Sequence, residues 1–297
     1  MDIAVGAAPT ALGHIGNARR RKIFLELNFA IPALVLLLLV LTAIFAPRLA
    51  PYDPLRISLT DRLLPPSFAG RSTAHLLGTD KLGRDILSRL IWGARVSLSV
   101  SLLVILITSA VGTALGILAG YLGGWVDSLL MRITDISLAF PAIMIALLLA
   151  VVMGPSFKTL VLAISLLGWA GYARLIRGEV LKLRQMDFVA QARIVGASPI
   201  RIMVTHIFPN IINTLLVLMT LSVGLIILTE SALSFLGAGI PPPTPSWGSM
   251  VADGRDLIQT AWWISFFPGV AIGLVVLSGN FLGDWLRDKL DPKLRQL

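Results

Sequence analysis

The chain has no cysteine among its 297 residues, which excludes disulfide bonds and thiolate metal sites. It has only three histidines, and they are too widely spread to predict a zinc or haem site. Charged residues make up only 14% of the chain, compared with about a quarter in a typical soluble domain. Hydrophobic residues make up 56%. This composition favours a membrane protein.

Motifs for nucleotide chemistry are missing as well. No G-x-x-x-x-G-K-[ST] phosphate-binding loop occurs in the sequence. We also find no plausible catalytic triad and no cluster of metal ligands, so we expect no catalytic residue, metal site or cofactor in this chain. If ATP drives the protein, ATP and Mg²⁺ must be bound by another chain.

In place of charge, the sequence has long apolar runs of about twenty residues, enough to cross the ~30 Å hydrocarbon core of a bilayer. The six runs are Phe29–Ala46, Val96–Tyr121, Leu129–Met153, Lys158–Leu175, Ile211–Leu236 and Trp262–Leu282. They predict an all-α integral membrane protein with six transmembrane helices. The first run has a signal peptide as its alternative, but Pro47 stands where cleavage would occur, and we expect the run to remain as an anchor.

Basic residues sit mostly at the ends of the runs, so membrane orientation explains the net charge of +9 better than nucleic acid binding does. Four consecutive basic residues, Arg19–Lys22, place the N-terminus in the cytoplasm, and six spans return the C-terminus there. The loop after the fourth run carries six basic and two acidic residues and also falls inside. The Pro47–Arg95 loop is basic but predicted outside, because long loops obey the rule poorly.

Two features predict contacts with the membrane interfaces. After Gly83, apolar residues recur at helical spacing and predict a short amphipathic helix at the outer interface, leading into the second run. Its apolar residues are Ile86, Leu87, Leu90, Ile91 and Trp92. The tryptophans near the two ends of the sixth run predict aromatic belts. They are Trp262, Trp263 and Trp285.

Small residues and a proline predict how two of the runs pack. Gly112, Gly116 and Gly120 recur every four residues, which favours close helix packing over a role in lining a path. In the third run, Arg132 and Asp135 are three residues apart and are expected to pair on one helix face. Pro141 removes a backbone hydrogen bond and predicts a kink in that run.

Glu230 is a carboxylate several residues inside the fifth apolar run. Such a charge is costly in a membrane and usually faces the interior of a helix bundle or a water-filled path. The alternative is a glutamate that is hydrogen-bonded to backbone or to a neighbouring span. Sequence alone leaves both interpretations open, and Glu230 and Asp135 are the two candidate polar residues within the spans.

The stretch between the fourth and fifth runs is too charged to be a seventh span. Within it, Phe188, Ala192 and Val195 fall on one face of a predicted helix. Gly196 is suited to a left-handed helix end, and the following Ser-Pro pair is suited to start a second helix. The sequence predicts a helix, a sharp turn, and a helix that leads into the fifth span. Its apolar face needs a cover, either lipid headgroups or a groove on a partner protein.

This stretch, Asp187–Asn210, resembles the cytoplasmic E-A-A-x-x-x-G loop of permease subunits in ATP-binding-cassette (ABC) importers. Aligned on Gly196, it keeps the motif at Ala192 and Gly196. It departs from the motif at Ala190, which replaces the glutamate, and at Gln191, which replaces the first alanine. The departure bears on an ion pair at the glutamate position and leaves the helix–turn–helix pattern intact.

Four further stretches extend the resemblance. "HIFPN" fits the H-x-x-P ending of the loop, while "LGTDKLGRDILSRLIWGARVSL", "ESALSFLGAGIPPPTPSWGSM" and "GDWLRDKLDP" resemble the dipeptide, oligopeptide and nickel permease branch, and within it the C-type subunit. The resemblance implies a type I ABC importer permease in a bacterial inner membrane. It implies an N-terminal module at 1–95, a five-span core at 96–285 with a coupling loop at 178–210, and a cytoplasmic tail at 286–297.

The same resemblance implies a set of partners: a second, homologous permease forming a heterodimer, two cytoplasmic ATPases and an extracytoplasmic solute-binding protein. It places the ATPase contact in the coupling loop, at Phe188, Val189, Ala192, Val195, Gly196 and Ala197. Peptide is the default substrate by resemblance. A stand-alone ion-coupled carrier using Glu230 and Asp135 is the alternative, although no internal repeat typical of such carriers is evident.

Overall fold

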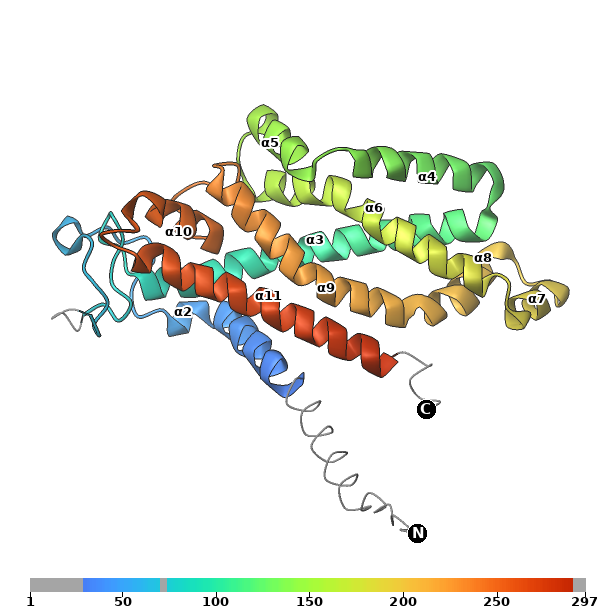
Figure 1. Cartoon of the computed structure of the whole chain (residues 1–297), viewed down its shortest axis with the longest axis horizontal. Coiled ribbons are helices and arrows are strands. Elements are labelled where there is room, and N and C mark those ends of the chain that lie inside the picture. The colour runs from blue at the N-terminus through green and yellow to red at the C-terminus, as the bar shows by residue number, and fades with distance from the viewer. Residues whose placement is uncertain (1–28, 70–73, 291–297) are drawn as a thin grey trace, which may run out of the picture.

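The computed structural model of the chain describes residues 29–69 and 74–290. In it, long helices run between two opposite ends of the molecule (Figure 1). After a first helix, Phe29–Ile44, come α2 (Ala46–Leu49), η1 (Leu59–Asp61), α3 (Ile86–Leu122), α4 (Gly124–Ala139), α5 (Ala142–Met153), α6 (Phe157–Leu183), α7 (Asp187–Ile194), α8 (Pro199–Ile202), η2 (Met203–Ile207), α9 (Phe208–Phe235), α10 (Trp247–Gly254), η3 (Arg255–Leu257) and α11 (Trp263–Leu290). We refer to the ends as the α7 end and the α10 end. The basic stretch Arg19–Lys22 and the residues after 290 lie outside the described ranges.

Within the described part of the chain, four helical segments are long and apolar enough to cross a membrane. They are α3, α6, α11 and the continuous helix from Pro199 to Phe235, which joins α8, η2 and α9. The bent pair of α4 and α5 raises the number to five if it counts as one span. The first helix is also apolar but shorter than these. The second, fourth, fifth and sixth predicted runs thus correspond to the four long helices, and the third corresponds to the bent pair.

The prediction of a separate interfacial helix at Ile86–Trp92 is wrong. These residues form the first turns of α3 itself, whose N-terminus is capped by the Asp85 carboxylate accepting the Ser88 N–H at 2.7 Å. The apolar side of these turns does not face lipid: Ile86 is buried with Met250 of α10 and Ile264 of α11. The helix does have an apolar side, as the pattern predicted, but other parts of the protein cover that side instead of lipid.

The third predicted run breaks where its proline stands. Phe140 is extended, Pro141 precedes α5, and α4 and α5 meet at 81°. The predicted pair of Arg132 with Asp135 does not form, because Asp135 reaches Arg174 on α6 instead. Helical spacing within one element identified Asp135 as a paired residue but named the wrong partner.

The three glycines on α3 lie against α6. A Cβ atom added to Gly116 would lie 2.7 Å from the Ala173 carbonyl oxygen and 3.0 Å from Ile176 Cβ. A Cβ atom on Gly112 would lie 2.5 Å from the Trp169 carbonyl oxygen. These are distances that real Cβ atoms do not tolerate, so α3 and α6 approach backbone to backbone, as small residues permit in membranes.

We expect Gly116→Val to destabilise the protein, because the new side chain would push α3 away from the α6 backbone. Overpacking of this kind costs about 1–3 kcal/mol. The matched control is Gly171→Val on α6, where an added Cβ meets no atom within 4 Å. Thermal unfolding of the detergent-solubilised protein should show a lower midpoint for the first variant, and equal midpoints would contradict the close packing.

Candidate functional site

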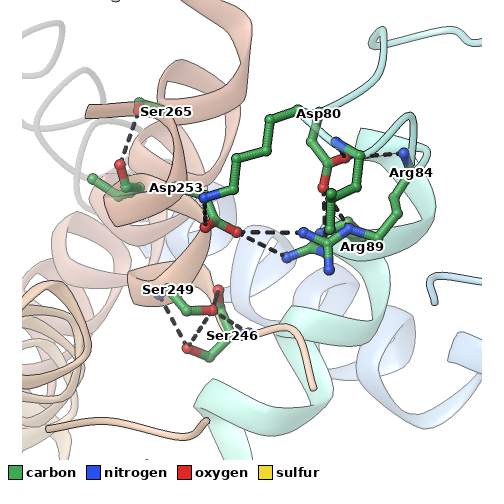
Figure 2. A network of polar contacts seen from close by, with 10 residues as sticks. Asp80, Arg84, Arg89, Ser246, Ser249, Asp253 and Ser265 are labelled. Atoms are coloured by element: carbon green, nitrogen blue, oxygen red, sulfur yellow. Dashed lines mark hydrogen bonds and ion pairs between the residues drawn. The ribbon is translucent and has the colours of Figure 1, made fainter. Parts of the chain in front are cut away.

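A network of buried charges ties the α10 end together (Figure 2). Asp80, in the loop before α3, accepts Arg84 Nε at 2.6 Å and lies 3.3 Å from Arg89 Nη1. Arg89 Nη2 is in turn 3.3 Å from Asp253 on α10, and Lys81 Nζ is 2.8 Å from the same carboxylate. Asp80, Arg84 and Arg89 are all buried. Since buried opposite charges must stay paired, the network fixes the loop before α3, α3 itself and α10 to one another.

Two tryptophans are part of this rigid end. Trp263 is buried, and its Nε1 donates to the Thr79 carbonyl oxygen at 3.1 Å. Trp247, the first residue of α10, donates from Nε1 to the Leu90 carbonyl oxygen at 3.0 Å. The prediction that Trp263 belongs to an interfacial belt is therefore wrong, because its polar atom is satisfied inside the protein. At the other end of α11, Trp285 stacks on Phe29 of the first helix with ring centroids 4.0 Å apart.

Glu230 lies fully buried where α9, α3 and α10 meet. Its carboxylate accepts Ser234 Oγ at 2.9 Å and Ser97 Oγ at 3.2 Å. Ser97 Oγ also accepts the backbone N–H of Trp247 at 3.3 Å, so the carboxylate is linked to the N-terminus of α10. A helix N-terminus carries partial positive charge and favours a nearby carboxylate. Of the two interpretations left open by the sequence, this geometry fits a hydrogen-bonded structural residue.

We expect Glu230→Leu to destabilise the α10 end, because the serine hydroxyls around it would lose their acceptor. A buried polar group left without a partner costs about 1–3 kcal/mol. Glu230→Gln keeps the shape and an acceptor oxygen and should be much less harmful. Limited proteolysis of the Gly237–Ala261 loop, together with the thermal midpoint, would measure both variants. Equal behaviour of the two would contradict a role based on hydrogen bonding.

At the α7 end, the predicted apolar face divides into an inner and an outer part. Val189 is fully buried in a cluster that includes Ile202 and Ile207, with Phe188, Ala192 and Ala197 packed against it. The prediction that Val195 shares a face with Phe188 and Ala192 is wrong. Val195 follows the last residue of α7 and is 86% exposed.

The outer part is an apolar tip formed by Ile194, Val195 and Ile200, whose exposed fractions are 85%, 86% and 71%. Gly196 turns the chain here with φ of +81°, a conformation that strongly favours glycine. Ser198 then caps α8 by accepting the Arg201 N–H at 3.3 Å. The turn and cap lie at the predicted residues, and they hold the tip away from the bundle.

α8 does not end before the membrane. It continues through the π-helical turn η2 into α9, so one helix of 37 residues joins the apolar tip to the α10 end of the bundle. Pro209 stands in the first turn of α9, directly after the π-helical turn. Because proline has no N–H to donate, a local change of hydrogen-bond pattern accommodates it without breaking the helix.

Arginines connect α6 and α7 to the corner between α3 and α4. Arg177 Nη2 donates to Asp127 Oδ2 on α4 at 2.6 Å. Arg193 of α7 lies over the ring of Tyr121, with its guanidinium carbon 5.2 Å from the ring centroid. Arg174 reaches Asp135 further along α4. These contacts join α7 to the end of α3, and α6 to α4.

A cavity of about 310 Å³ lies between α3, α4, α5, α6 and α9. Most of its lining is apolar, but five hydroxyl-bearing residues contribute to it. They are Thr108, Ser137, Tyr172, Ser222 and Thr229. Tyr172 donates its hydroxyl to Ser222 Oγ at 2.8 Å, an interaction that joins α6 to α9. No group of metal-ligating side chains occurs within residues 29–69 and 74–290.

Comparison with known proteins gives two family matches. Residues 112–296 match the family described as binding-protein-dependent transport system inner membrane component. Residues 31–66 match the family described as N-terminal TM domain of oligopeptide transport permease C. The second match covers most of the first helix and the beginning of the loop that leads to α3, and so both the predicted N-terminal module and the core have relatives.

Individual relatives agree with these families. The dipeptide transport system permease protein DppC of Escherichia coli K12 is 49% identical over 269 residues, which are 90% of this chain and 90% of that protein. The di/tripeptide transport system permease protein DppC of Pseudomonas aeruginosa is 44% identical over 263 residues, 88% of this chain and 87% of that protein. The dipeptide transport system permease protein DppC of Bacillus subtilis is 42% identical over 263 residues, which are 88% of this chain and 81% of that protein.

The match at residues 112–296 covers α4, α5, α6 and α9, which contribute to the cavity, and the helix that carries the apolar tip. The chain belongs to the family of binding-protein-dependent transport system inner membrane components, and is a multi-pass membrane permease subunit with the N-terminal module of the oligopeptide permease C type.

Proposed function

We propose that this chain is one of two homologous permease subunits of an ATP-driven importer of di- and oligopeptides, and forms half of its translocation path. The observation that carries the proposal is the exposed apolar tip at Ile194–Val195, held out by a left-handed glycine at the start of a helix that runs through the bundle. Such a tip suits insertion into a groove on a partner protein. Peptide as the substrate follows the names of the relatives.

The partners in this proposal are a second permease in a heterodimer, two ATPases at the α7 end, and a solute-binding protein at the α10 end. ATP and Mg²⁺ belong to the ATPases, and this chain supplies only their mechanical connection. The α7 end and both chain termini then lie in the cytoplasm of a bacterial cell with six spans crossing the inner membrane. The 47–95 loop and the Gly237–Ala261 loop lie outside.

The connections at the α7 end suggest how the ATPases drive transport. When ATP binding closes the ATPase pair, the apolar tip moves with the groove that holds it. The continuous helix from Pro199 to Phe235 carries that movement into the bundle, the contact of Arg193 with Tyr121 carries it to the end of α3, and Arg177 joins α6 to α4. Since α4, α6 and α9 enclose the cavity, the movement changes the side from which the cavity is open.

Replacing Val195 with aspartate is expected to release the ATPases while leaving the protein inserted. The side chain is exposed, so folding tolerates the charge, but a carboxylate in a closed apolar groove without a partner is costly. We expect the amount of ATPase that co-purifies with the complex to fall at least about tenfold, which corresponds to a loss of ~1.4 kcal/mol.

The control for charge is Gln185→Asp, an exposed residue in the link between α6 and α7 that lies off the apolar tip. It should leave ATPase binding unchanged. Gly196→Val tests the turn separately, because a β-branched residue resists a φ of +81°. If the Val195→Asp variant co-purified with as much ATPase as the unchanged protein, the proposed coupling role of the tip would be wrong.

The proposed orientation can be tested by cysteine labelling, since the chain has no cysteine of its own. Thr244→Cys in the outer loop should react with a membrane-impermeant maleimide added outside the cell, and Ser198→Cys at the α7 end should not. Both residues are exposed, so burial does not bias the comparison. Ser246 is unsuitable because it is buried as the cap of α10. Labelling of Ser198→Cys from outside would mean that the α7 end faces the outside of the cell, which would contradict the proposed orientation.

A stand-alone carrier driven by an ion gradient would need a carboxylate that gains and loses a proton in each cycle. Glu230 is enclosed by serines and fixed to α10, and Asp135 is paired with Arg174, so neither is placed as a free proton carrier. We expect Glu230→Gln to retain most ATP-dependent uptake in vesicles, with or without a proton gradient. Complete loss of uptake with assembly intact would favour the carrier.

A further inference from the structure

The cavity between α3, α4, α5, α6 and α9 lies at the middle depth of the predicted spans. Thr108 of α3 and Ser222 of α9 both line it, and they lie near the middles of the second and fifth apolar runs. Runs of this length cross a ~30 Å hydrocarbon core, so both residues are far from either membrane surface. The cavity volume of about 310 Å³ is at the lower limit of the ~300–1,000 Å³ typical of sites for small molecules. Its depth and size suit one end of a small solute.

The polarity of this cavity comes from hydroxyl groups alone. None of the described residues that line it carries a charge. Apart from the five hydroxyl-bearing residues named above, its lining is made of apolar side chains and a glycine. What the cavity can bind therefore depends on whether these hydroxyls are free to donate or to accept hydrogen bonds.

The hydrogen atoms of all five hydroxyls are already engaged within the protein. Thr108, Ser137, Ser222 and Thr229 each donate to the carbonyl oxygen four residues earlier in their own helix, at 2.7–3.0 Å. Tyr172 donates to Ser222 Oγ at 2.8 Å. A hydroxyl has one hydrogen to donate and two lone pairs that accept. Because the hydrogens are used, these side chains offer the cavity acceptor oxygens and no donor.

The aromatic part of the lining has the same electrostatic preference. The rings of Phe140 and Tyr172 both line the cavity. The face of an aromatic ring attracts a cation. A carboxylate is a poor match for such side chains, because it can only accept hydrogen bonds and carries negative charge. An ammonium group is a good match, because it has three donors, no acceptor and a positive charge.

We propose that this cavity receives the amino-terminal ammonium group of a peptide as it crosses, held by the hydroxyl oxygens of Thr108, Ser137 and Thr229 and by the aromatic rings. The inference rests on the proposed function and names the end of the substrate that this chain contacts. Neutral acceptors replace part of the hydration of the ammonium group without an acidic partner that would retain it. A transport path needs binding of this kind, which is favourable enough for entry and weak enough for release.

The test uses the assembled, detergent-solubilised importer without the binding protein. Ala142→Cys, at an exposed position in the cavity lining, reports occupancy through its rate of modification by the neutral reagent methyl methanethiosulfonate, followed by mass spectrometry of this chain. Thr244→Cys, exposed in the loop after α9 and outside the lining, shows whether peptide affects the reagent itself. Alanyl-alanine is added in its free, N-acetylated and C-amidated forms.

Free and C-amidated alanyl-alanine should slow the modification of Ala142→Cys at similar concentrations. The N-acetylated form should need at least about tenfold more peptide, because it lacks the charged donor. Adding Thr229→Val removes one acceptor with little change of shape, and should raise the required concentration of free peptide by about threefold while leaving the N-acetylated form unchanged. The matched control is Thr220→Val on the same helix. Its hydroxyl also donates to the carbonyl oxygen four residues earlier, at 2.8 Å, but lies outside the lining, so neither peptide should be affected.

Equal protection by the free and N-acetylated peptides, or no protection by any of them, would mean that the hydroxyls serve only their own helices. A larger effect of amidation than of acetylation would mean that a carboxylate is bound, at the first N–H groups of α5 beside Ala142, and would overturn the inference. An unreactive Ala142→Cys would place the cavity outside the aqueous path and would also overturn it. None of these results bears on the proposed function, which is judged separately by ATPase co-purification and ATP-dependent uptake in the unmodified complex.

Discussion

The close contact between α3 and α6 is the constraint on which the rest of the molecule depends. Because three glycines on α3 leave no room for a side chain, α6 runs directly along the α3 backbone and has little freedom to shift. α6 in turn determines where α7 begins, and it supplies Arg174 and Arg177 to α4. The apolar tip and the cavity are therefore positioned by the same helix contact, although they lie at different depths.

The two ends of the bundle differ in how they are held. At the α10 end, charged groups, tryptophans and Glu230 form interlocking buried contacts between the loop before α3, α9, α10 and α11. α4 has a much weaker attachment: Thr134 is its buried residue, and two ion pairs join it to α6. A bundle that is held firmly at the α10 end and only loosely along α4 can change the shape of its cavity without unfolding the α10 end.

Local patterns predicted the parts of the structure that depend on local physics. The long apolar helices, the break at Pro141 and the turn at Gly196 were all readable, because hydropathy, proline and the left-handed conformation act within a few residues. Long-range pairing was not readable. Asp135 pairs with Arg174 instead of Arg132, and Arg89 pairs with Asp253, 164 residues away, because only the packing of the helices decides which charges meet.

The same limit explains the errors about burial. The segment from Ile86 to Trp92 has the pattern of an interfacial helix, and Trp263 has the position of an interfacial tryptophan, but the loop before α3 and α10 cover both. A sequence pattern shows that a face is apolar without showing what covers it. The same holds for polar residues, as Glu230 and Asp135 show: the sequence does not reveal what surrounds them. Both are carboxylates within predicted apolar runs, yet Glu230 is enclosed by neutral serine hydroxyls and Asp135 is exposed beside an arginine. Enclosure by hydroxyl donors makes Glu230 a fixed joint between α9, α3 and α10, whereas the exposed Asp135–Arg174 pair joins α4 to α6 at the surface of the described bundle. Two carboxylates that look alike in the sequence thus have different surroundings, because only the packing of the helices decides which groups meet each of them.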